Sequence, residues 1–439
     1  MKNVRQHTRP STRNYDYLRP SIHTAMAKSI KKIINDPVHG FIDIPNHLGG
    51  ELIEHRYFQR LRGVKQLGLT HLVYPGAVHT RFQHAIGAMH LMKQAIDVLR
   101  SKDHDITHEE EEAAICAILL HDVGHGPFSH ALEFSIVEGI SHEQLSLLMM
   151  HRLNEELGGR LTLAIDIFTD KYPKRFLHQL ISSQLDVDRL DYLTRDSFFT
   201  GVVEGSVGLD RIIKMLEVVN DELVVEAKGI YSIEKFLIAR RLMYWQVYLH
   251  KTVVAAEQLL IQVFKRAREC LKAGVPIYTT PILRYFLEKR FSKRSGTNQH
   301  ELIDNFVTLD DADIVVCLKE WERSGDFILS NLCRMLNSRN IFKIELGKLP
   351  FTSQKVTQKS DAFVKATGMD ESVAAYFVLS QAVSNKAYSP KNQSINILDK
   401  SGQLESIEQA SDVLNSAAFE RVTTKYFLCY PKTSYEFKF

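Results

Sequence analysis

A histidine and an aspartate lie side by side at His121 and Asp122, directly after the apolar run AAICAILL. Apolar residues that return every three and four positions over residues 109–120 predict a helix. The glycines and the proline of VGHGP predict that this helix ends just after the pair. A packed helix presents an imidazole and a carboxylate from a rigid support, as metal binding requires. We therefore interpret His121 and Asp122 as candidate metal ligands.

A His-Asp dipeptide alone is a weak indication. His104-Asp105 is also such a pair, but it lies in the polar segment SKDHDITHEE, where a solvated surface loop is expected. For His121 the alternative is a buried helix C-terminus, where the helix dipole favours histidine. What favours the metal site over this alternative is the presence of further histidines and acidic residues. They lie in the segments HGPFSH, SHEQ, HTRFQH and DVDRLDY.

Two more residues could complete the ligand set. His84 lies in HTRFQHAIGAMHLM on a helical face with small and apolar residues, so a buried core histidine is the alternative. Asp188 lies in QLDVDRLDYLTRD, where carboxylates share a predicted helix with leucines that pack. Burying unpaired carboxylates is costly, so a cation partner is expected.

Two imidazoles and two carboxylates would hold one divalent ion and leave positions for water and a substrate oxygen. Iron, manganese, zinc, nickel and magnesium all fit this donor set. Such a site lowers the pKa of bound water and polarises a phosphoryl oxygen, which phosphoester hydrolysis needs.

Composition limits the class of protein. The chain has 439 residues, a length that favours one large domain with an appended lobe, or two domains. Its formal charge of +3 does not indicate nucleic-acid binding. It has no apolar run of about 18 residues, so no membrane span is expected. Its 5 cysteines form no C-x-x-C pair, which is typical of reduced thiols and favours a cytoplasmic location.

Three regions are predicted along the chain. Residues 1–30 form a flexible basic tail, and Met26 resembles a natural start, so the preceding residues could be an upstream extension. Residues 31–345 form a helical domain with small β-hairpin insertions. Residues 346–439 form a C-terminal α/β lobe with strand-like segments at AAYFVLS, INILDKSGQLES and KYFLCYP. The expected fold class is mainly α.

The chain resembles the HD superfamily of metal-dependent phosphohydrolases, and within it the deoxynucleoside triphosphate triphosphohydrolase subgroup. The resemblance runs from about Ile33 to the end of the chain. It is carried by the segments NDPVHGFIDI, YFQRLRGVKQLGLTHLVYPGAVHTRFQHAIG, LLHDVGHGPFSHALE, SHEQ and DVDRLDYLTRDS. It implies the metal ligands His84, His121, Asp122 and Asp188, and hydrolysis to a deoxynucleoside and intact triphosphate. Some members also carry a SAM domain, which is not expected here because only a short tail precedes the match.

The resemblance also assigns His142, His125 and His130 to the catalytic centre. Ser141 and Gln144 predict a capping box that would hold His142 at a helix start, as suits a proton donor. The helix N-terminus would lower the pKa of His142, while Glu143 and a polyphosphate would raise it. The alternative is that His142 only decorates the cap. His125 and His130 could shuttle protons or contact phosphate.

Substrate contacts follow from the same resemblance. Arginine donates bidentate hydrogen bonds to phosphate, and aromatic rings line sugar and base pockets. The implied triphosphate contacts are Arg81, Arg189 and Arg240; the pocket wall is Tyr192 and Tyr248; the ribose contacts are Gln66, Leu67 and Asp196. Magnesium could accompany the nucleotide. For these polar positions the alternative is ordinary ion pairing on helix surfaces.

Regulated members of the family bind an activating nucleotide between subunits. The matching positions are Glu54, Gln59 and Arg62, where glutamate replaces the aspartate of the family. The resemblance thus implies an allosteric nucleotide and a homo-oligomer, either a dimer or a tetramer.

Two other functions compete with the triphosphohydrolase. One is a different HD enzyme, a phosphomonoesterase or phosphodiesterase acting on another nucleotide; the long match from QLGL to HTRFQH favours the first function over it. The other is a catalytically silent nucleotide sensor, against which the complete set of four ligands and His142 argues.

Overall fold

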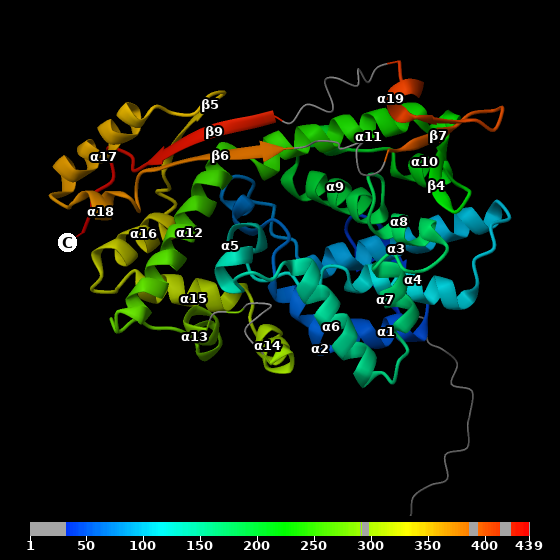
Figure 1. Ribbon diagram of the computed structural model, residues 1–439, viewed down its shortest axis with the longest axis horizontal. Helices are drawn as coiled ribbons and strands as arrows, with labels where there is room; N and C mark the ends of the chain where they lie inside the picture. The colour runs from blue at the N-terminus through cyan, green and yellow to red at the C-terminus, as the bar shows by residue number, and fades with distance from the viewer. Residues whose placement is uncertain (1–31, 290, 292–297, 386–393, 413–422, 439) are drawn as a thin grey trace, which may run out of the picture.

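The computed structural model describes residues 32–289, 291, 298–385, 394–412 and 423–438. The expected tail, residues 1–30, lies outside them. Helices make up most of the described chain, and small sheets lie at its periphery (Figure 1). The predicted fold class, mainly α with small β-hairpins, is confirmed.

The helices that carry the site pack on one another, with α3 in contact with both α4 and α9. Their beginnings are set by polar caps: Thr107 and Glu110 cap α4, Ser141 and Gln144 cap α6, and Asp186 caps α9. These helices are α3 (Arg81–Ser101), α4 (His108–Leu120), α5 (Ser129–Ile136), α6 (His142–Glu156) and α9 (Val187–Thr200).

The other helices surround this group and extend it. In the N-terminal half they are α1 (His47–Glu54), α2 (Arg56–Gln59), η1 (Arg60–Gly63), η2 (Gly68–Leu72), α7 (Thr162–Phe168), α8 (Arg175–Ile181), η3 (Val203–Gly205) and α10 (Leu209–Lys214). Next come η4 (Ala227–Gly229), α11 (Ile230–Met243), the π-helical η5 (Tyr244–Tyr248), α12 (Lys251–Lys272), α13 (Pro281–Glu288), α14 (Gln299–Phe306), α15 (Asp311–Trp321) and α16 (Phe327–Asn337). The last are α17 (Ser353–Thr367), α18 (Glu371–Ala374) and α19 (Ile407–Ala410).

The described strands form three small sheets. The first is the antiparallel hairpin of β1 (Ile33–Asp36) and β2 (Gly40–Asp43). The second has the order β3-β4-β7-β8, from β3 (Leu216–Val219), β4 (Glu222–Glu226), β7 (Asn396–Leu398) and β8 (Leu404–Ser406). The third has the order β5-β9-β6, from β5 (Lys343–Gly347), β9 (Thr423–Tyr430) and β6 (Leu379–Asn385).

The C-terminal strands belong to two different sheets. Strand β7 pairs in parallel with β4 of the helical region, where Val225 lies opposite Ile397. Strand β9 instead lies between β5 and β6 and pairs with both, near α16, α17 and α18, at the other end of the molecule (Figure 1). The chain after residue 346 therefore contacts the helical body at both ends.

One predicted strand is wrong over most of its length. The run AAYFVLS, residues 374–380, was expected to be extended, but α18 ends at Ala374, a turn follows, and β6 begins only at Leu379. Asp370 caps α18 by accepting a hydrogen bond from the backbone of Val373. Phe377 is fully buried, so the apolar run serves core packing and not strand pairing.

A continuous apolar core runs through the described residues. Among them, no helix combines the length and the apolar character needed to cross a bilayer.

Candidate metal centre and active site

Four side chains predicted as metal ligands lie together where three helices meet. His84 comes from the first turn of α3, His121 and Asp122 follow the end of α4, and Asp188 comes from the first turn of α9. Asp188 Oδ1 lies 3.0 Å from His84 Nε2 and 3.4 Å from His121 Nε2. Ligand atoms of His84, His121 and Asp122 lie within 4.8 Å of one another.

Both imidazoles are held by their other nitrogen. His84 Nδ1 is 2.8 Å from Asp191 Oδ2, and His121 Nδ1 is 2.6 Å from the Ile118 carbonyl oxygen. If each Nδ1 carries the proton, each Nε2 offers a lone pair to the centre. The two Nε2 atoms are buried and have no hydrogen-bond partner among the described residues. Buried lone pairs beside two carboxylates fit a divalent cation.

The pKa values show how strongly these charges act on one another. Burial lowers the pKa of His84, but the contacts with Asp188 and Asp191 outweigh burial and raise it to about 10. Burial raises the pKa of Asp188, but His121 and His84 hold it well below its ordinary value. Without a cation the His84 imidazole therefore holds a proton at neutral pH, and a metal ion would replace that proton.

Asp191 lies behind the metal centre and is fully buried. Besides His84, it accepts hydrogen bonds from His39 Nε2 at 2.7 Å and from Arg195 Nε and Nη2 at 2.9 and 3.0 Å. Burial raises the pKa of Asp191, but Arg195 and the two histidines hold it well below its ordinary value. Asp191 is therefore a fixed carboxylate that orients His84.

Gly87 allows this carboxylate to lie against α3. A Cβ atom at Gly87 would lie 2.0 Å from Asp191 Oδ1 and 2.2 Å from Arg195 Nη2, so any side chain would displace the pair. The close packing of α3 and α9 behind the metal centre therefore depends on a residue without a Cβ atom.

Arg81 and His125 contact the second carboxylate, Asp122. Arg81 Nη1 donates a hydrogen bond of 2.5 Å to Asp122 Oδ2, and His125 Nε2 lies 3.2 Å from Oδ1. Burial and the charge of Arg81 hold the pKa of His125 well below its ordinary value, so this histidine is neutral at pH 7.

His142 lies at the N-terminus of α6, beside His125. The two rings stack, with centroids 3.9 Å apart. Glu133 of α5 contacts His142 twice: its Oε1 lies 2.6 Å from Nδ1 and accepts the backbone N–H at 3.1 Å. Hydrogen bonding to His142 lowers the pKa of Glu133 to about 2.

Glu143 was expected to act on His142 through its charge. Its side chain is exposed on α6, and the carboxylate that contacts the imidazole is that of Glu133. His130 lies on α5, and its side chain is outside the described part of the structure.

The three predicted phosphate-binding arginines share one feature. Each has a buried Nε atom without a hydrogen-bond partner among the described residues: Arg81, Arg189 and Arg240. Arg189 also donates a short hydrogen bond to Asp186, and Arg240 Nη1 donates to Gln184 Oε1 at 3.2 Å. Their free donors fit an anionic ligand.

The predicted sugar-binding residues form a second group. Tyr248 donates to Asp196 Oδ2 at 2.7 Å, and His79 Nε2 lies 2.8 Å from Asp196 Oδ1. The rings of Tyr192 and Tyr248 are 6.1 Å apart. Burial raises the pKa of Tyr192, while the charges of Arg240 and Arg189 oppose this rise, so these groups act on one another electrostatically.

The other two predicted ribose contacts are both buried. Gln66 and Leu67 lie just before η2, and Gln66 Oε1 has no hydrogen-bond partner among the described residues.

The three predicted activator residues are divided between two places. Arg62 Nε donates to Gln59 Oε1 at 2.9 Å, and its guanidinium stacks on Phe82, 3.5 Å from the ring centroid. Glu54 instead accepts a hydrogen bond of 2.9 Å from Lys32 Nζ.

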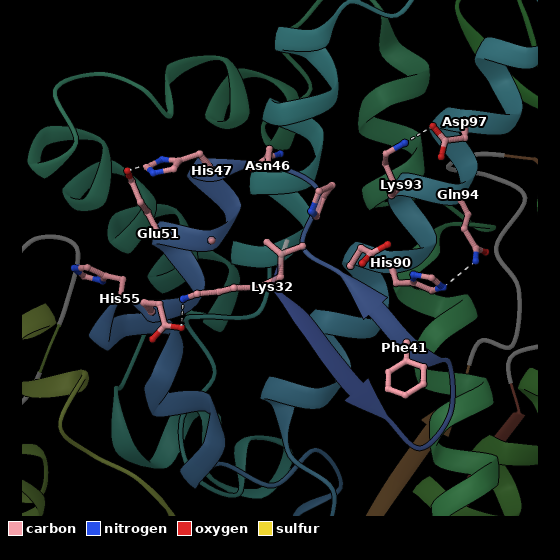
Figure 2. Close-up of a pocket in the computed structure, with 15 residues that line it drawn as sticks. Lys32, Phe41, Asn46, His47, Glu51, His55, His90, Lys93, Gln94 and Asp97 are labelled. Carbon is pink, nitrogen blue, oxygen red and sulfur yellow. Dashed lines mark hydrogen bonds and ion pairs between the residues drawn. The ribbon is translucent and has the colours of Figure 1, made fainter. Parts of the chain in front are cut away.

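Glu54 and Lys32 line a groove of about 940 Å³ between the β1–β2 hairpin, α1 and α3 (Figure 2). Its walls also include Phe41, His47, His90 and Lys93. Gln59 and Arg62 are not among its lining residues.

Sequence reasoning did not assign roles to Glu133, His39 or His79. Glu133 follows HGPFSHAL and lies nine residues before His142, but the turn between α5 and α6 decides that they meet. His39 lies in the quoted segment NDPVHG, and its partner is 152 residues away. The only sequence signal for His39 and His79 is that each lies in a segment that carries the family resemblance, NDPVHG for His39 and GAVHTRFQH for His79.

Comparisons with known proteins agree with this site. The HD domain model matches residues 81–196, which include the four candidate ligands, and the model of the HD associated region matches residues 207–275. A crystal structure of a phosphohydrolase from Bacteroides thetaiotaomicron shares 50% sequence identity with a TM-score of 0.89, and the match covers 92% of this chain and 100% of that chain.

Two relatives of known sequence extend the comparison. An uncharacterized protein of Bacillus subtilis is 31% identical over 417 residues, which are 92% of this chain and 93% of that protein. A deoxynucleoside triphosphate triphosphohydrolase SAMHD1 homolog of Dictyostelium discoideum is 33% identical over 267 residues, 56% of this chain. The match spans 51% of that homolog, about half its length. With this fold and these motifs, the chain belongs to the HD superfamily of phosphohydrolases.

Proposed function

We propose that the protein hydrolyses deoxynucleoside triphosphates to a deoxynucleoside and inorganic triphosphate with one divalent metal ion. The observation that carries the proposal is the pair of unpartnered Nε2 atoms of His84 and His121 facing two carboxylates. The Dictyostelium relative named for this activity supports the choice of substrate.

His84, His121, Asp122 and Asp188 would hold the ion. When bound, a divalent ion supplies a polarised phosphoryl oxygen and a bound water of lowered pKa. Imidazole and carboxylate donors together accept several metals, including iron, manganese, zinc, nickel and magnesium.

His142 is proposed to protonate the leaving 5′ oxygen. Its Nδ1 is held by Glu133, so Nε2 is the ring nitrogen that can donate a proton to the substrate. His125 stacks on the ring and fixes its plane. The arrangement is a carboxylate-oriented imidazole, in which Glu133 positions His142 and does not itself reach the substrate.

The free guanidinium donors of Arg81, Arg189 and Arg240 are proposed to bind the triphosphate. Tyr192 and Tyr248 would line the pocket for the sugar and the base. Asp196, which contacts both His79 and Tyr248, would contact the ribose. Each Asp196 oxygen already contacts one of these two side chains, so the position of the carboxylate is fixed before the substrate binds.

The test is a product analysis. The purified protein is incubated with Mn²⁺ and each of the four deoxynucleoside triphosphates, and products are identified by phosphorus NMR and chromatography. We expect inorganic triphosphate and deoxynucleoside in equal amounts. Formation of monophosphate or diphosphate would instead indicate a phosphomonoesterase or another HD enzyme, and binding without turnover would indicate a nucleotide sensor.

Matched variants link the activity to the site. His121→Ala is expected to abolish turnover, whereas His104→Ala, which alters the second His-Asp pair, is expected to retain it. Loss of activity in both variants, or in neither, would contradict the assignment of the metal centre.

An activating nucleotide and a cytoplasmic dimer or tetramer are also part of the proposal. Glu54 in the groove and the pair of Gln59 and Arg62 are the residues to vary. Activity that appears only in mixtures of nucleotides, together with a larger mass in light scattering, is the expected sign of activation.

A further inference from the structure

His39 lies in the turn of the β1–β2 hairpin, far in sequence from the proposed metal ligands. The turn is fixed by Asp36, whose Oδ1 accepts the backbone N–H groups of Val38 and His39 at 3.0 and 2.9 Å. The side chain of His39 is almost fully buried, and its Nε2 reaches Asp191 Oδ1 on α9 at 2.7 Å.

Asp191 connects this hairpin to the metal centre. While Oδ1 accepts His39, Oδ2 lies 2.8 Å from His84 Nδ1, so one carboxylate holds both histidines. Arg195 binds Asp191 and also donates to Asp36 at 2.7 and 3.3 Å. The hairpin turn and α9 thus form a closed ring of hydrogen bonds, and α3 is joined to this ring through His84.

Each donor in this ring restrains the carboxylate from a different side. Arg195 neutralises the charge of Asp191, but a guanidinium alone can draw the carboxylate toward itself. The His39 bond opposes that rotation and keeps Oδ2 directed at His84. Carboxylates in this position orient a metal-bound imidazole and raise its basicity as a ligand.

We infer that His39 is a positioning residue for the metal centre: by fixing Asp191, it sets the orientation of His84 toward the ion. The inference rests on the proposed metal centre and not on the identity of the substrate. His39 itself does not touch the ion, so its effect is on metal affinity through His84.

The test compares His39→Gln with His39→Asn. The glutamine amide reaches as far as Nε2 of histidine and can donate to Asp191, whereas the shorter asparagine amide cannot. Asparagine is one methylene shorter than glutamine and leaves a larger void, so thermal unfolding is needed to separate a packing defect from an effect on the metal centre. Mn²⁺ affinity of the metal-free protein is measured by titration calorimetry, and thermal unfolding is measured in chelator.

We expect His39→Asn to weaken Mn²⁺ binding roughly 10- to 100-fold. His39→Gln should stay within about threefold of the parent, and both variants should unfold in chelator in a single cooperative transition well above the temperature of the titration. As a control, His178→Ala removes a half-buried histidine of α8 whose Nδ1 contacts the Ile167 carbonyl oxygen, and it should bind Mn²⁺ as the parent does.

Parent-like Mn²⁺ affinity in His39→Asn, or equal losses in the asparagine and glutamine variants, would overturn the inference. His84→Ala separates this failure from failure of the proposed function. If His84→Ala abolishes Mn²⁺ binding while His39→Asn does not, only the role of His39 is wrong. If His84→Ala binds Mn²⁺ normally, the metal centre itself is misassigned.

Discussion

The proposed proton donor, His142, depends on a neighbouring carboxylate for its position. Glu133 contacts both the ring and the backbone N–H of His142, so it fixes the ring at the helix start. A general acid contributes typically about 10²- to 10⁴-fold to the rate. The residue that orients it contributes part of that factor.

Glu133→Gln should therefore lower kcat by roughly tenfold, and His142→Asn by roughly a hundredfold or more. The matched control is Glu143→Gln, which changes an exposed carboxylate one residue from His142. Steady-state kinetics with a deoxynucleoside triphosphate measures all three. A larger loss in Glu143→Gln than in Glu133→Gln would restore Glu143 as the partner.

Glu257 on α12 determines a pH dependence of stability. Burial raises its pKa to about 7, against an ordinary value of 4.5. The folded protein thus binds this proton more tightly than the unfolded chain, so stability falls as pH rises from about 4.5 to about 7 and then stays level. Glu257→Gln removes this effect.

The expected gain of Glu257→Gln at pH 8 is roughly 1–3 kcal/mol, with little difference near pH 4.5. Denaturant unfolding at both pH values measures it. An equal effect of the substitution at the two pH values would show that Glu257 does not titrate in this range.

At the scale of elements, the helix ends near the site could be predicted because their signals are local. The capping box of Ser141 and Gln144 was predicted and is present, and the small hairpins predicted in the helical domain are formed by β1–β2 and β3–β4. Such features depend on residues within one or two turns of each other.

Long-range contacts could not be predicted in the same way. The parallel pairing of Val225 with Ile397 joins segments far apart in the chain, and apolar patterning does not specify a partner strand. The run before Leu379 was misassigned because buried apolar residues such as Phe377 occur in turns as well as strands. The partner of His142 was missed because tertiary packing of α5 selects Glu133 over its neighbour in sequence.

The close approach of α3 and α9 gives a prediction at this scale. Gly87→Ala should destabilise the protein by roughly 1–3 kcal/mol, because the new Cβ overlaps Asp191 and Arg195. The substitution should also weaken Mn²⁺ binding, since Asp191 orients His84. Helix propensity alone predicts the opposite sign, a gain of about 0.5–1 kcal/mol.

Gly50→Ala is the matched control, because Gly50 also lies in a helix, α1. Its added Cβ would meet its nearest atom, in Ile44, at an ordinary 3.8 Å. Calorimetry of both variants in chelator and with Mn²⁺ makes the comparison. A Gly87→Ala protein as stable as Gly50→Ala would show that the two helices can separate without cost.

At the scale of the whole molecule, the proposed metal ion would connect three helices that are distant in sequence. Its ligands come from α3, the end of α4 and α9, and the histidines among them are separated by 37 positions, from His84 to His121. A ligand that binds only the folded state stabilises the entire fold, by about 2.7 kcal/mol at a concentration 100 times its Kd.

For a chain of 439 residues the entropy of unfolding is about 0.9 kcal/mol per kelvin, so this stabilisation raises Tm by about 3 °C. We expect chelator to lower Tm by this amount and Mn²⁺ to restore it. His104→Ala should show the same shift, because its His-Asp pair lies outside the centre. His84→Ala should lose it, because the substitution removes a buried imidazole from the four proposed ligands. A shift that persists in His84→Ala would place the stabilising ion elsewhere in the molecule.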